Sequence, residues 1–348
     1  MRALILESLA PVSEQPEPLR LAEVADPVPG PGQVGIRVHV CGVCHTELDE
    51  IEGRAPPPTL PVIPGHQVVG TVTAAGSGVD TRLIGTRVGV AWIASACGRC
   101  RYCLRGAENL CPEFRATGRD VNGGYAEFMT ARAEYVYAIP GGFSDLQAAP
   151  LLCAGAIGHR SLRLARMQDG MALGLTGFGG SGHLVLQEVR HRFPGARVYV
   201  FARSVEERRF ALDGGAAWAG DTSDRPPELL DAVIDTTPAW TPVVAALRVL
   251  APGGRLVVNA IRKEAGDASV LQSIDYATHL WMEKEIKSVA NVTRVDVREF
   301  LDVAASARIV PEVEEFPMGD ANRAIRELKE RHVRGAKVLR ISGHGAVA

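Results

Sequence analysis

The chain has 348 residues, of which 46% are apolar and 22% charged, a composition typical of a globular protein with room for two domains. Its 38 basic and 40 acidic residues give a formal charge of −2, and the sequence contains no basic tract, so we expect no nucleic-acid partner. No window approaches 18 uninterrupted apolar residues and the N-terminus lacks a signal-peptide pattern, so we expect a cytoplasmic protein without a membrane span.

The first part of the chain is expected to be mainly β. Short runs rich in Val and Ile, punctuated by Gly and Pro, predict strands at 33–40, 66–76 and 86–93. From about residue 150 apolar strands alternate with helical patterns, which predicts a parallel, doubly wound sheet. The strands are expected at 171–175, 196–204, 230–238 and 285–292, with helices between them. The last stretch, 293–348, predicts helices at 295–308 and 320–332 and a strand at 336–342.

Four cysteines lie within one short segment, CGRCRYCLRGAENLC. The spacing of Cys97, Cys100, Cys103 and Cys111 suits a tetrahedral, all-thiolate zinc site, and such a closed site is structural. An iron–sulfur cluster is the alternative, because C-x2-C-x2-C begins like the bacterial ferredoxin run. Here the fourth cysteine follows after seven residues rather than three, which favours zinc.

A glycine-rich turn, GFGGSG at 177–182, follows the strand MALGL and opens a helix. In this context it predicts a dinucleotide-binding turn, because the backbone can approach a pyrophosphate at a helix start. The candidate cofactor-binding glycines are Gly177, Gly179, Gly180 and Gly182.

The acidic residue that usually binds the cofactor ribose is missing at the end of the second strand, near Ala202. Arg203 and Ser204 follow instead, and a guanidinium can hold a 2′-phosphate through two hydrogen bonds. The sequence therefore predicts NADP(H) in preference to NAD(H). The alternative is that Arg203 stacks on the adenine or faces water.

Three cysteines and a histidine remain as candidate donors for a second metal. A C-x-x-C pair such as Cys41 and Cys44 is compatible with a redox dithiol, half of a zinc site, or one ligand beside a bystander. His66 in PGHQVVG and Cys153 are the other candidates. Two cysteines and one histidine are a known ligand set for a catalytic zinc with an open position.

Taken together, these motifs resemble those of the zinc-dependent, medium-chain alcohol dehydrogenases over nearly the whole chain. The chain looks most similar to bacterial alcohol dehydrogenases that also resemble cinnamyl-alcohol dehydrogenases. The matching segments are GVCHT at 42–46, PGH at 64–66, the four-cysteine segment, GGYAE at 123–127, CAG at 153–155, the glycine turn and ANVTR at 290–294.

The resemblance implies an α/β protein with three segments. A GroES-like, mainly-β catalytic domain spans 1–152 and includes a structural-zinc lobe at about 94–114. A Rossmann domain spans 153–290, and the segment 291–348 returns to the catalytic domain. The family further implies a homo-oligomer, either a dimer or a tetramer.

The resemblance also assigns roles to individual residues, and it implies two zinc ions per chain. It implies hydride transfer between a small primary alcohol or aldehyde, aliphatic or aromatic, and a nicotinamide cofactor. The implied residues are Cys44, His66 and Cys153 as catalytic-zinc ligands, Thr46 as proton relay, His45 and Arg334 near the pyrophosphate, and Trp92 in the substrate pocket.

Three positions depart from the family pattern. Gln67 stands where a glutamate usually follows the ligand histidine, so the metal site is one negative charge lighter. Glu47 replaces the usual aspartate and is expected to accept a hydrogen bond from His66. Asp49 replaces the histidine that often ends the proton relay.

Two other kinds of protein compete with this interpretation. A zinc-free quinone or enoyl reductase of the same superfamily does not account for Cys44, His66, Cys153 and the four-cysteine segment together. A nucleotide-sensing zinc protein without enzymatic activity does not account for Thr46 beside a metal ligand. The residues therefore favour an alcohol dehydrogenase.

Overall fold

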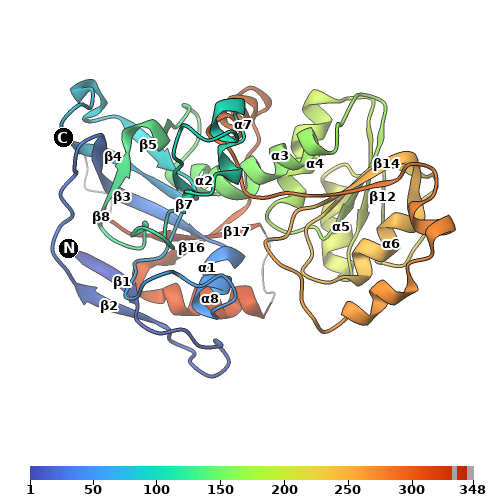
Figure 1. Cartoon of the computed structure of the whole chain (residues 1–348), viewed down its shortest axis with the longest axis horizontal. Coiled ribbons are helices and arrows are strands. Elements are labelled where there is room, and N and C mark those ends of the chain that lie inside the picture. The colour runs from blue at the N-terminus through green and yellow to red at the C-terminus, as the bar shows by residue number, and fades with distance from the viewer. Residues whose placement is uncertain (331–334, 343–348) are drawn as a thin grey trace. The chain divides into compact units, whose positions relative to one another are not determined.

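The computed structural model describes residues 1–330 and 335–342, and the chain divides into two compact units (Figure 1). The first unit contains Met1–Cys153, Val292–Ala305 and the stretch that begins at Val310. The second unit contains Ala154–Asn291 and Ser306–Ile309. The C-terminal part of the chain therefore belongs mainly to the same unit as the N-terminal part.

The first unit is organised around a seven-stranded sheet with the order β16-β17-β3-β4-β5-β9, in which β8 also pairs with β3. Strand β3 carries Val34, Ile36 and Val38 at every second position, and all three are fully buried because alternate side chains share one face. The unit also has β1 paired with β2, and β6 paired with β7. Its strands are β1 (Arg2–Leu6), β2 (Leu19–Glu23), β3 (Gln33–Val43), β4 (Val68–Ala75), β5 (Arg87–Val90), β6 (Ile93–Ser95), β7 (Arg115–Ala116), β8 (Phe128–Arg132), β9 (Val136–Ala138), β16 (Val313–Pro317) and β17 (Ala336–Arg340).

Amphipathic helices cover this β core. In α8, Ala321, Ala324, Ile325 and Leu328 are buried at the spacing of one helix face, and they join the core of the first unit. The helices that begin in this unit are α1 (His45–Ile51), α2 (Asp145–Pro150), α7 (Arg294–Ala307) and α8 (Ala321–Lys329), with short helical turns at Thr81–Leu83, Cys103–Arg105, Glu108–Leu110, Ala133–Tyr135, Leu151–Gly155 and Met318–Asp320.

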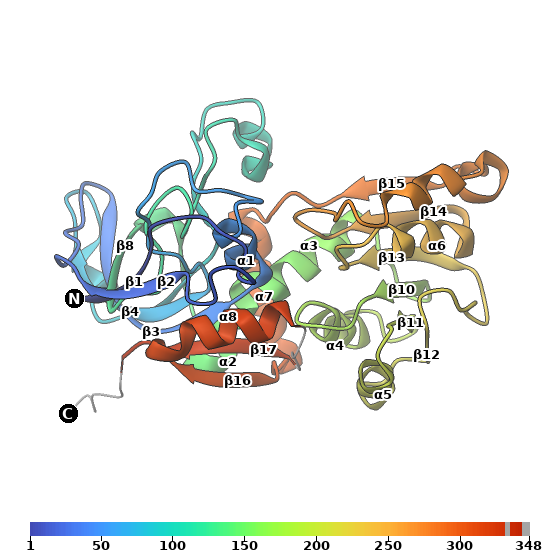
Figure 2. The same ribbon diagram turned by 90° about the horizontal axis from the view of Figure 1, so that it is seen from below.

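The second unit has a six-stranded parallel sheet with the order β12-β11-β10-β13-β14-β15 (Figure 2). The chain runs outward from β10 in one direction and then outward from β13 in the other, so the order reverses between these two strands. The elements are β10 (Ala172–Thr176), β11 (Arg197–Phe201), β12 (Trp218–Gly220), β13 (Leu230–Asp235), β14 (Leu250–Val258), β15 (Glu285–Ser288), α3 (Ala156–Leu164), α4 (Gly182–Arg192), α5 (Val205–Asp213), α6 (Thr241–Val249) and helical turns at Ala268–Ser273 and Tyr276–Leu280.

Separate apolar clusters form on the two faces of this sheet. Leu173 and Leu175 of β10 pack with Val185 and Val189 of α4, whereas Leu247 of α6 belongs to the other cluster. Helices therefore cover both faces, which confirms the predicted doubly wound α/β fold. Among the described helices, none has both the length and the apolarity that a membrane crossing requires.

The strand predicted at 86–93 is interrupted, which corrects the sequence-based expectation. β5 ends at Val90, and β6 begins at Ile93 and pairs with β7 in a different sheet. The chain changes sheets at Ala91 and Trp92, where the carbonyl oxygen of Trp92 accepts a hydrogen bond of 2.7 Å from the Thr117 N–H. Trp92 is therefore placed by a loop between two strands.

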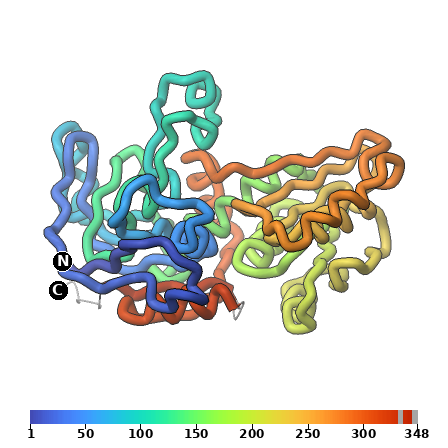
Figure 3. The backbone as a smooth tube through the Cα atoms, turned by 60° about the horizontal axis from the view of Figure 1, so that its bottom comes forward, coloured from blue at the N-terminus to red at the C-terminus, as the bar shows by residue number. Residues whose placement is uncertain are grey.

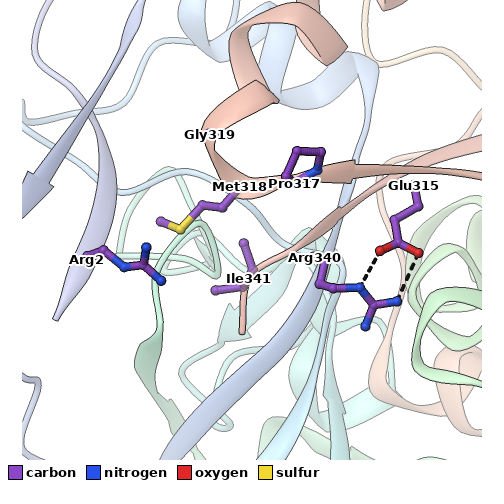
Figure 4. Close-up of a pocket in the computed structure, with 7 residues that line it drawn as sticks. All are labelled: Arg2, Glu315, Pro317, Met318, Gly319, Arg340 and Ile341. Carbon is purple, nitrogen blue, oxygen red and sulfur yellow. Dashed lines mark hydrogen bonds and ion pairs between the residues drawn. The ribbon is translucent and has the colours of Figure 1, made fainter. Parts of the chain in front are cut away.

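A shallow pocket of about 450 Å³ lies in the first unit beside β16 and β17 (Figure 4). Its two guanidinium groups already have acidic partners: Arg340 pairs with Glu315, and Arg2 donates to Glu127 over 2.9 Å. None of the residues predicted from the sequence to act in catalysis lines it.

Candidate active site

Cys44 lies between the end of β3 at Val43 and the start of α1 at His45. Its backbone N–H donates to Glu47 Oε2 over 2.9 Å, so this carboxylate satisfies an amide at the helix start. Its sulfur lies 3.6 Å from Thr46 Oγ1. The strand-to-helix junction thus fixes the thiol and brings a hydroxyl next to it.

His66 follows a tight Pro-Gly turn. Gly65 has a φ of +97°, and a Cβ there would collide with the ring of Tyr125 and the sulfur of Cys41. The His66 side chain is 1% exposed, and its Nδ1 pairs with Glu47 Oε1, so the expected hydrogen bond is present. Its Nε2 is buried and makes no hydrogen bond to any described residue.

Cys153 lies in the π-helical turn Leu151–Gly155, between α2 and α3. Single π turns within helices are frequent at functional sites. One sulfur each of Cys44 and Cys153 and one ring nitrogen of His66 lie within 4.8 Å of one another. Two thiols and an unsatisfied imidazole nitrogen therefore converge, which is the donor set of a zinc site with an open position.

Proton affinities in this cluster are strongly perturbed. The Cys153 thiol lowers the pKa of Cys44 well below its ordinary value. The same contact, together with burial, raises the pKa of Cys153. Burial lowers the pKa of His66, but the Glu47 carboxylate and the Cys44 thiol outweigh burial and raise it. The cluster thus favours a thiolate at Cys44 but protons on Cys153 and His66, and a divalent cation bound there would displace those protons.

The four cysteines between 97 and 111 form a second cluster, on a segment that projects from the first unit (Figure 3). Their sulfurs lie within 4.8 Å of one another. The backbone N–H groups of Cys100 and Cys97 donate to the sulfurs of Cys97 and Cys111, each over 3.4 Å. Backbone N–H donation by Cys103 lowers the pKa of Cys100 to about 7, whereas burial raises the pKa of Cys103 to about 12. The convergence of four sulfurs fits a closed thiolate site, in which a bound cation would displace the proton that Cys103 otherwise keeps.

Arg294, the first residue of α7, anchors this lobe. Its backbone N–H and its Nε donate to Glu108 Oε1 over 2.7 and 3.0 Å, and its Nη2 donates to Glu108 Oε2 over 2.9 Å. A further bond of 3.0 Å reaches Glu134, and the guanidinium lies 4.7 Å from the centre of the Tyr135 ring. A bidentate pair of this kind is stronger than an exposed one.

The glycine turn of the second unit lies at the carboxyl end of β10. Gly177 has a φ of +79°, and its N–H donates to the Phe201 carbonyl over 2.9 Å. A Cβ on Gly182 would lie 2.9 Å from the Gly177 carbonyl oxygen, so glycine permits a close approach there. The turn lies where the strand order reverses, which is the usual place for a dinucleotide in such sheets.

Comparisons with known proteins agree with this architecture. Residues 30–141 match the alcohol dehydrogenase GroES-like domain, and residues 216–339 match the zinc-binding dehydrogenase family. A probable alcohol dehydrogenase AdhA of Mycobacterium tuberculosis is 43% identical over 329 residues, which cover 93% of each protein. An alcohol dehydrogenase of Geobacillus stearothermophilus is 33% identical over 341 residues, covering 95% of this chain and 98% of the relative.

Solved structures show the same likeness. A cinnamyl alcohol dehydrogenase of Sorghum bicolor superposes with a TM-score of 0.82 at 27% identity, covering 98% of both chains. The chain belongs to the medium-chain zinc alcohol dehydrogenase family. It is therefore an alcohol and aldehyde oxidoreductase that uses a nicotinamide cofactor.

The structure shows the contacts of two residues that depart from the family pattern, Gln67 and Asp49. The Gln67 side chain is 3% exposed and lies directly over Gly42, where a Cβ would approach it to 2.8 Å. The Asp49 carboxylate forms an ion pair of 2.6 Å with Arg54. In this alcohol dehydrogenase the amide is packed against backbone and the acid is held by a cation.

The predicted cofactor-binding residues differ in their surroundings. His45 is the first residue of α1 and is exposed, and Arg203 is also exposed. Ser204 caps α5: its Oγ accepts from the Glu207 N–H over 3.2 Å and donates to Glu206 over 2.6 Å. Arg334 lies outside the described residues.

Sequence reasoning missed two groups of buried polar residues. Lys263 pairs with Asp235 at the end of β13 and donates to the carbonyl oxygens of Thr237 and Ala239 over 2.8 and 2.9 Å. Glu50 of α1 is 1% exposed and accepts a hydrogen bond from Trp92. A helix prediction at 45–51 would have flagged Glu50, because it shares a face with Glu47 three residues earlier.

Proposed function

We propose that this alcohol dehydrogenase holds a catalytic zinc ion with Cys44, His66 and Cys153, and a structural zinc ion with the four cysteines of the lobe. The observation that carries the first site is the buried His66 Nε2, which makes no hydrogen bond to a described residue and lies among two thiols. A buried polar atom is costly when it has no partner, and a metal ion would supply one.

The surrounding residues have definable roles in the reaction. A bound zinc ion supplies Lewis acidity toward the substrate oxygen, and the nicotinamide supplies or accepts the hydride. Glu47 fixes the His66 ring through Nδ1, which directs Nε2 toward the sulfurs. The Thr46 hydroxyl, beside Cys44, passes on the proton that an alcohol loses on oxidation, and it supplies a proton to the substrate oxygen when an aldehyde is reduced. We propose primary alcohols and their aldehydes, aliphatic or aromatic, as substrates.

Metal analysis with turnover tests this proposal. We expect two zinc ions per chain in the purified protein, and reduction of small aldehydes that ceases when a chelator removes the more labile ion. One zinc ion per chain, with full activity, would mean that only the lobe binds metal. A metal-free active enzyme would overturn both assignments.

We infer that the enzyme prefers NADP(H). The exposed Arg203 follows β11, and Arg208 lies nearby because its Nη1 donates to the Ala202 and Arg203 carbonyl oxygens over 2.8 and 3.2 Å. Two guanidinium groups favour a 2′-phosphate. Arg203→Gln should lower kcat/KM for NADPH about tenfold and leave that for NADH nearly unchanged. Arg209→Gln, also exposed on α5, is the matched control. A higher kcat/KM for NADH in the wild type would contradict the proposal.

We also infer a homo-oligomer, either a dimer or a tetramer. Strand β15 ends the six-stranded sheet and exposes all four of its side chains. Trp281 and Met282 precede it and are more than half exposed. An open sheet edge with apolar neighbours favours pairing with a second copy across a two-fold axis. Light scattering should give a multiple of the chain mass, and Ile286→Lys should reduce it.

A cytoplasmic location is consistent with the cysteines. All seven are free of disulfides in the structure. Two thiolate clusters require a reducing compartment to stay competent for metal. We therefore propose that the enzyme works in the cytoplasm.

A further inference from the structure

Groups from several segments of the first unit surround Trp92. Its indole Nε1 donates to Glu50 Oε1 over 3.3 Å. The Arg119 guanidinium lies 5.4 Å from the centre of its ring. The His66 ring meets it edge-on with centroids 6.4 Å apart, and Phe114 lies 5.6 Å away. The orientation of this indole is therefore specified on several sides, next to a proposed metal ligand.

Glu50 is the unusual member of this group. It is a carboxyl group with 1% exposure, on the same helix as the carboxylate that holds His66. Within the described residues, its side-chain hydrogen bond comes from Trp92, and the Arg119 guanidinium is one nearby cation. Burial and the charge on Glu47 both raise the pKa of Glu50. A buried carboxyl group with a single donor is costly to leave unpaired, so it resists rotation of that donor.

We propose that Glu50 is a positioning residue that sets the selectivity of the enzyme for aldehyde size, by fixing the orientation of Trp92 beside His66. The inference rests on the proposed function, because it takes His66 as a ligand of the catalytic metal. Trp92 then borders the space in which the aldehyde carbon must lie. A fixed indole admits a small aldehyde and restricts a bulky one, whereas a released indole can turn aside.

Two substitutions of Glu50 by side chains of similar size separate the effect of the hydrogen bond from the effect of side-chain volume. Glu50→Gln retains an acceptor for the indole N–H, and Glu50→Met does not. We would measure kcat/KM for acetaldehyde and for benzaldehyde. E50M should shift the ratio toward benzaldehyde by about fivefold, the effect of losing one hydrogen bond, and E50Q should stay within about twofold of the wild type.

A second background tests whether Glu50 acts through Trp92. In W92F, which has no indole N–H, E50M should leave the ratio where W92F alone places it. An unmoved ratio in E50M alone, or the same fivefold shift in both backgrounds, would overturn the proposal. If the wild type reduces neither aldehyde, the proposed function itself fails. If the wild type reduces the aldehydes normally and the ratio in E50M does not change, only the proposed role of Glu50 fails.

An NMR measurement decides the case if E50M does not fold. The indole proton of Trp92 can be identified in wild-type protein labelled with 15N-tryptophan by its absence from W92F. We expect it to exchange with solvent at least about tenfold more slowly than the indole proton of Trp281, which is 54% exposed. Equal exchange rates would show that Glu50 does not hold the indole, and would overturn the proposal.

Discussion

The two cysteine-containing clusters of the first unit both hold their donor atoms within 4.8 Å of one another, but they take these donors from the sequence in different ways. The lobe takes four donors from the single segment 97–111. The other cluster takes three donors from a strand-to-helix junction, a Pro-Gly turn and a π-helical turn, at Cys44, His66 and Cys153. The first set needs only a short loop to fold on itself, whereas the second requires the whole β domain to be in place.

The groups that hydrogen-bond to each cluster also differ: those of the lobe include backbone groups of the same short segment, and those of the other cluster include a buried side chain. In the lobe, backbone N–H groups within the segment donate to the sulfurs, and the pair between Arg294 and Glu108 attaches it to α7. In the other cluster, the buried carboxylate of Glu47 bonds both the Cys44 amide and the His66 ring. Local donors suit a site that only holds structure. A buried carboxylate suits the catalytic role proposed for the other cluster, because it orients a candidate ligand and raises its basicity.

The sharpest way to separate the two clusters is to remove one thiol from the cluster of Cys44, His66 and Cys153. Cys44→Ser should lower kcat for aldehyde reduction by about a thousandfold, because the Lewis acid loses a ligand. It should leave one zinc ion per chain and change the melting temperature little. Steady-state kinetics and metal analysis measure these outcomes.

Cys41 provides a matched control three residues away. It is fully buried but belongs to neither cluster, so Cys41→Ser should keep two zinc ions and most of the turnover. A loss of activity in C41S as large as in C44S would mean that the effect is structural. Substantial turnover in C44S would mean that this thiol does not hold the catalytic metal.

The converse substitution in the lobe should affect stability more than chemistry. Cys103→Ser removes one of four thiolates, so the lobe should lose its metal and the melting temperature should fall by about 10 °C. The kcat of the folded enzyme should stay within about threefold. Calorimetry and metal analysis test this expectation, which retention of both zinc ions would contradict.

The smallest expected effect concerns the attachment of the lobe and depends on pH. Burial opposes ionisation of Glu108, but hydrogen bonds from Arg294 outweigh it and lower its pKa. A lowered pKa means that the pair stabilises the fold above about pH 4 and that this stabilisation is lost as the pH falls through the lowered pKa. Glu108→Gln should therefore lower the melting temperature by about 3–5 °C at pH 7.

The difference between Glu108→Gln and the wild type should shrink below about pH 4, where the wild-type carboxylate also becomes protonated. Glu113→Gln is the control, because Glu113 lies in the same region and its carboxylate makes an exposed contact of 3.4 Å with Arg99. A difference that stays constant at every pH would mean that the charge of Glu108 does not matter.

Most of the fold could be predicted from the sequence, because its signals are local. Alternating apolar residues place β3, and the glycine turn places the start of α4 beside β10. The four-cysteine segment is equally local. The strand expected at 86–93 was wrong at Trp92, because the chain there changes partner strands, and pairing with residues 115–116 leaves no mark in a short window.

The site could be predicted only in part, because its support is made of distant contacts. Glu50 and Trp92 are 42 residues apart, and neither carries a pattern that points to the other. The role of Ser204 as a helix cap was also missed, since a serine before a helix serves equally well as a ligand or a cap. Such pairings depend on which surfaces meet after folding.

Because the four lobe cysteines lie in one short segment, they can be gained or lost together as the gene evolves. One deletion or exchange of the segment 97–111 would remove or supply all four thiols together, with the anchor at Arg294 left in the scaffold. The other cluster would need separate changes at three distant codons, each constrained by the core around it. The two clusters can therefore be lost or altered independently as a gene diverges, although one polypeptide carries both.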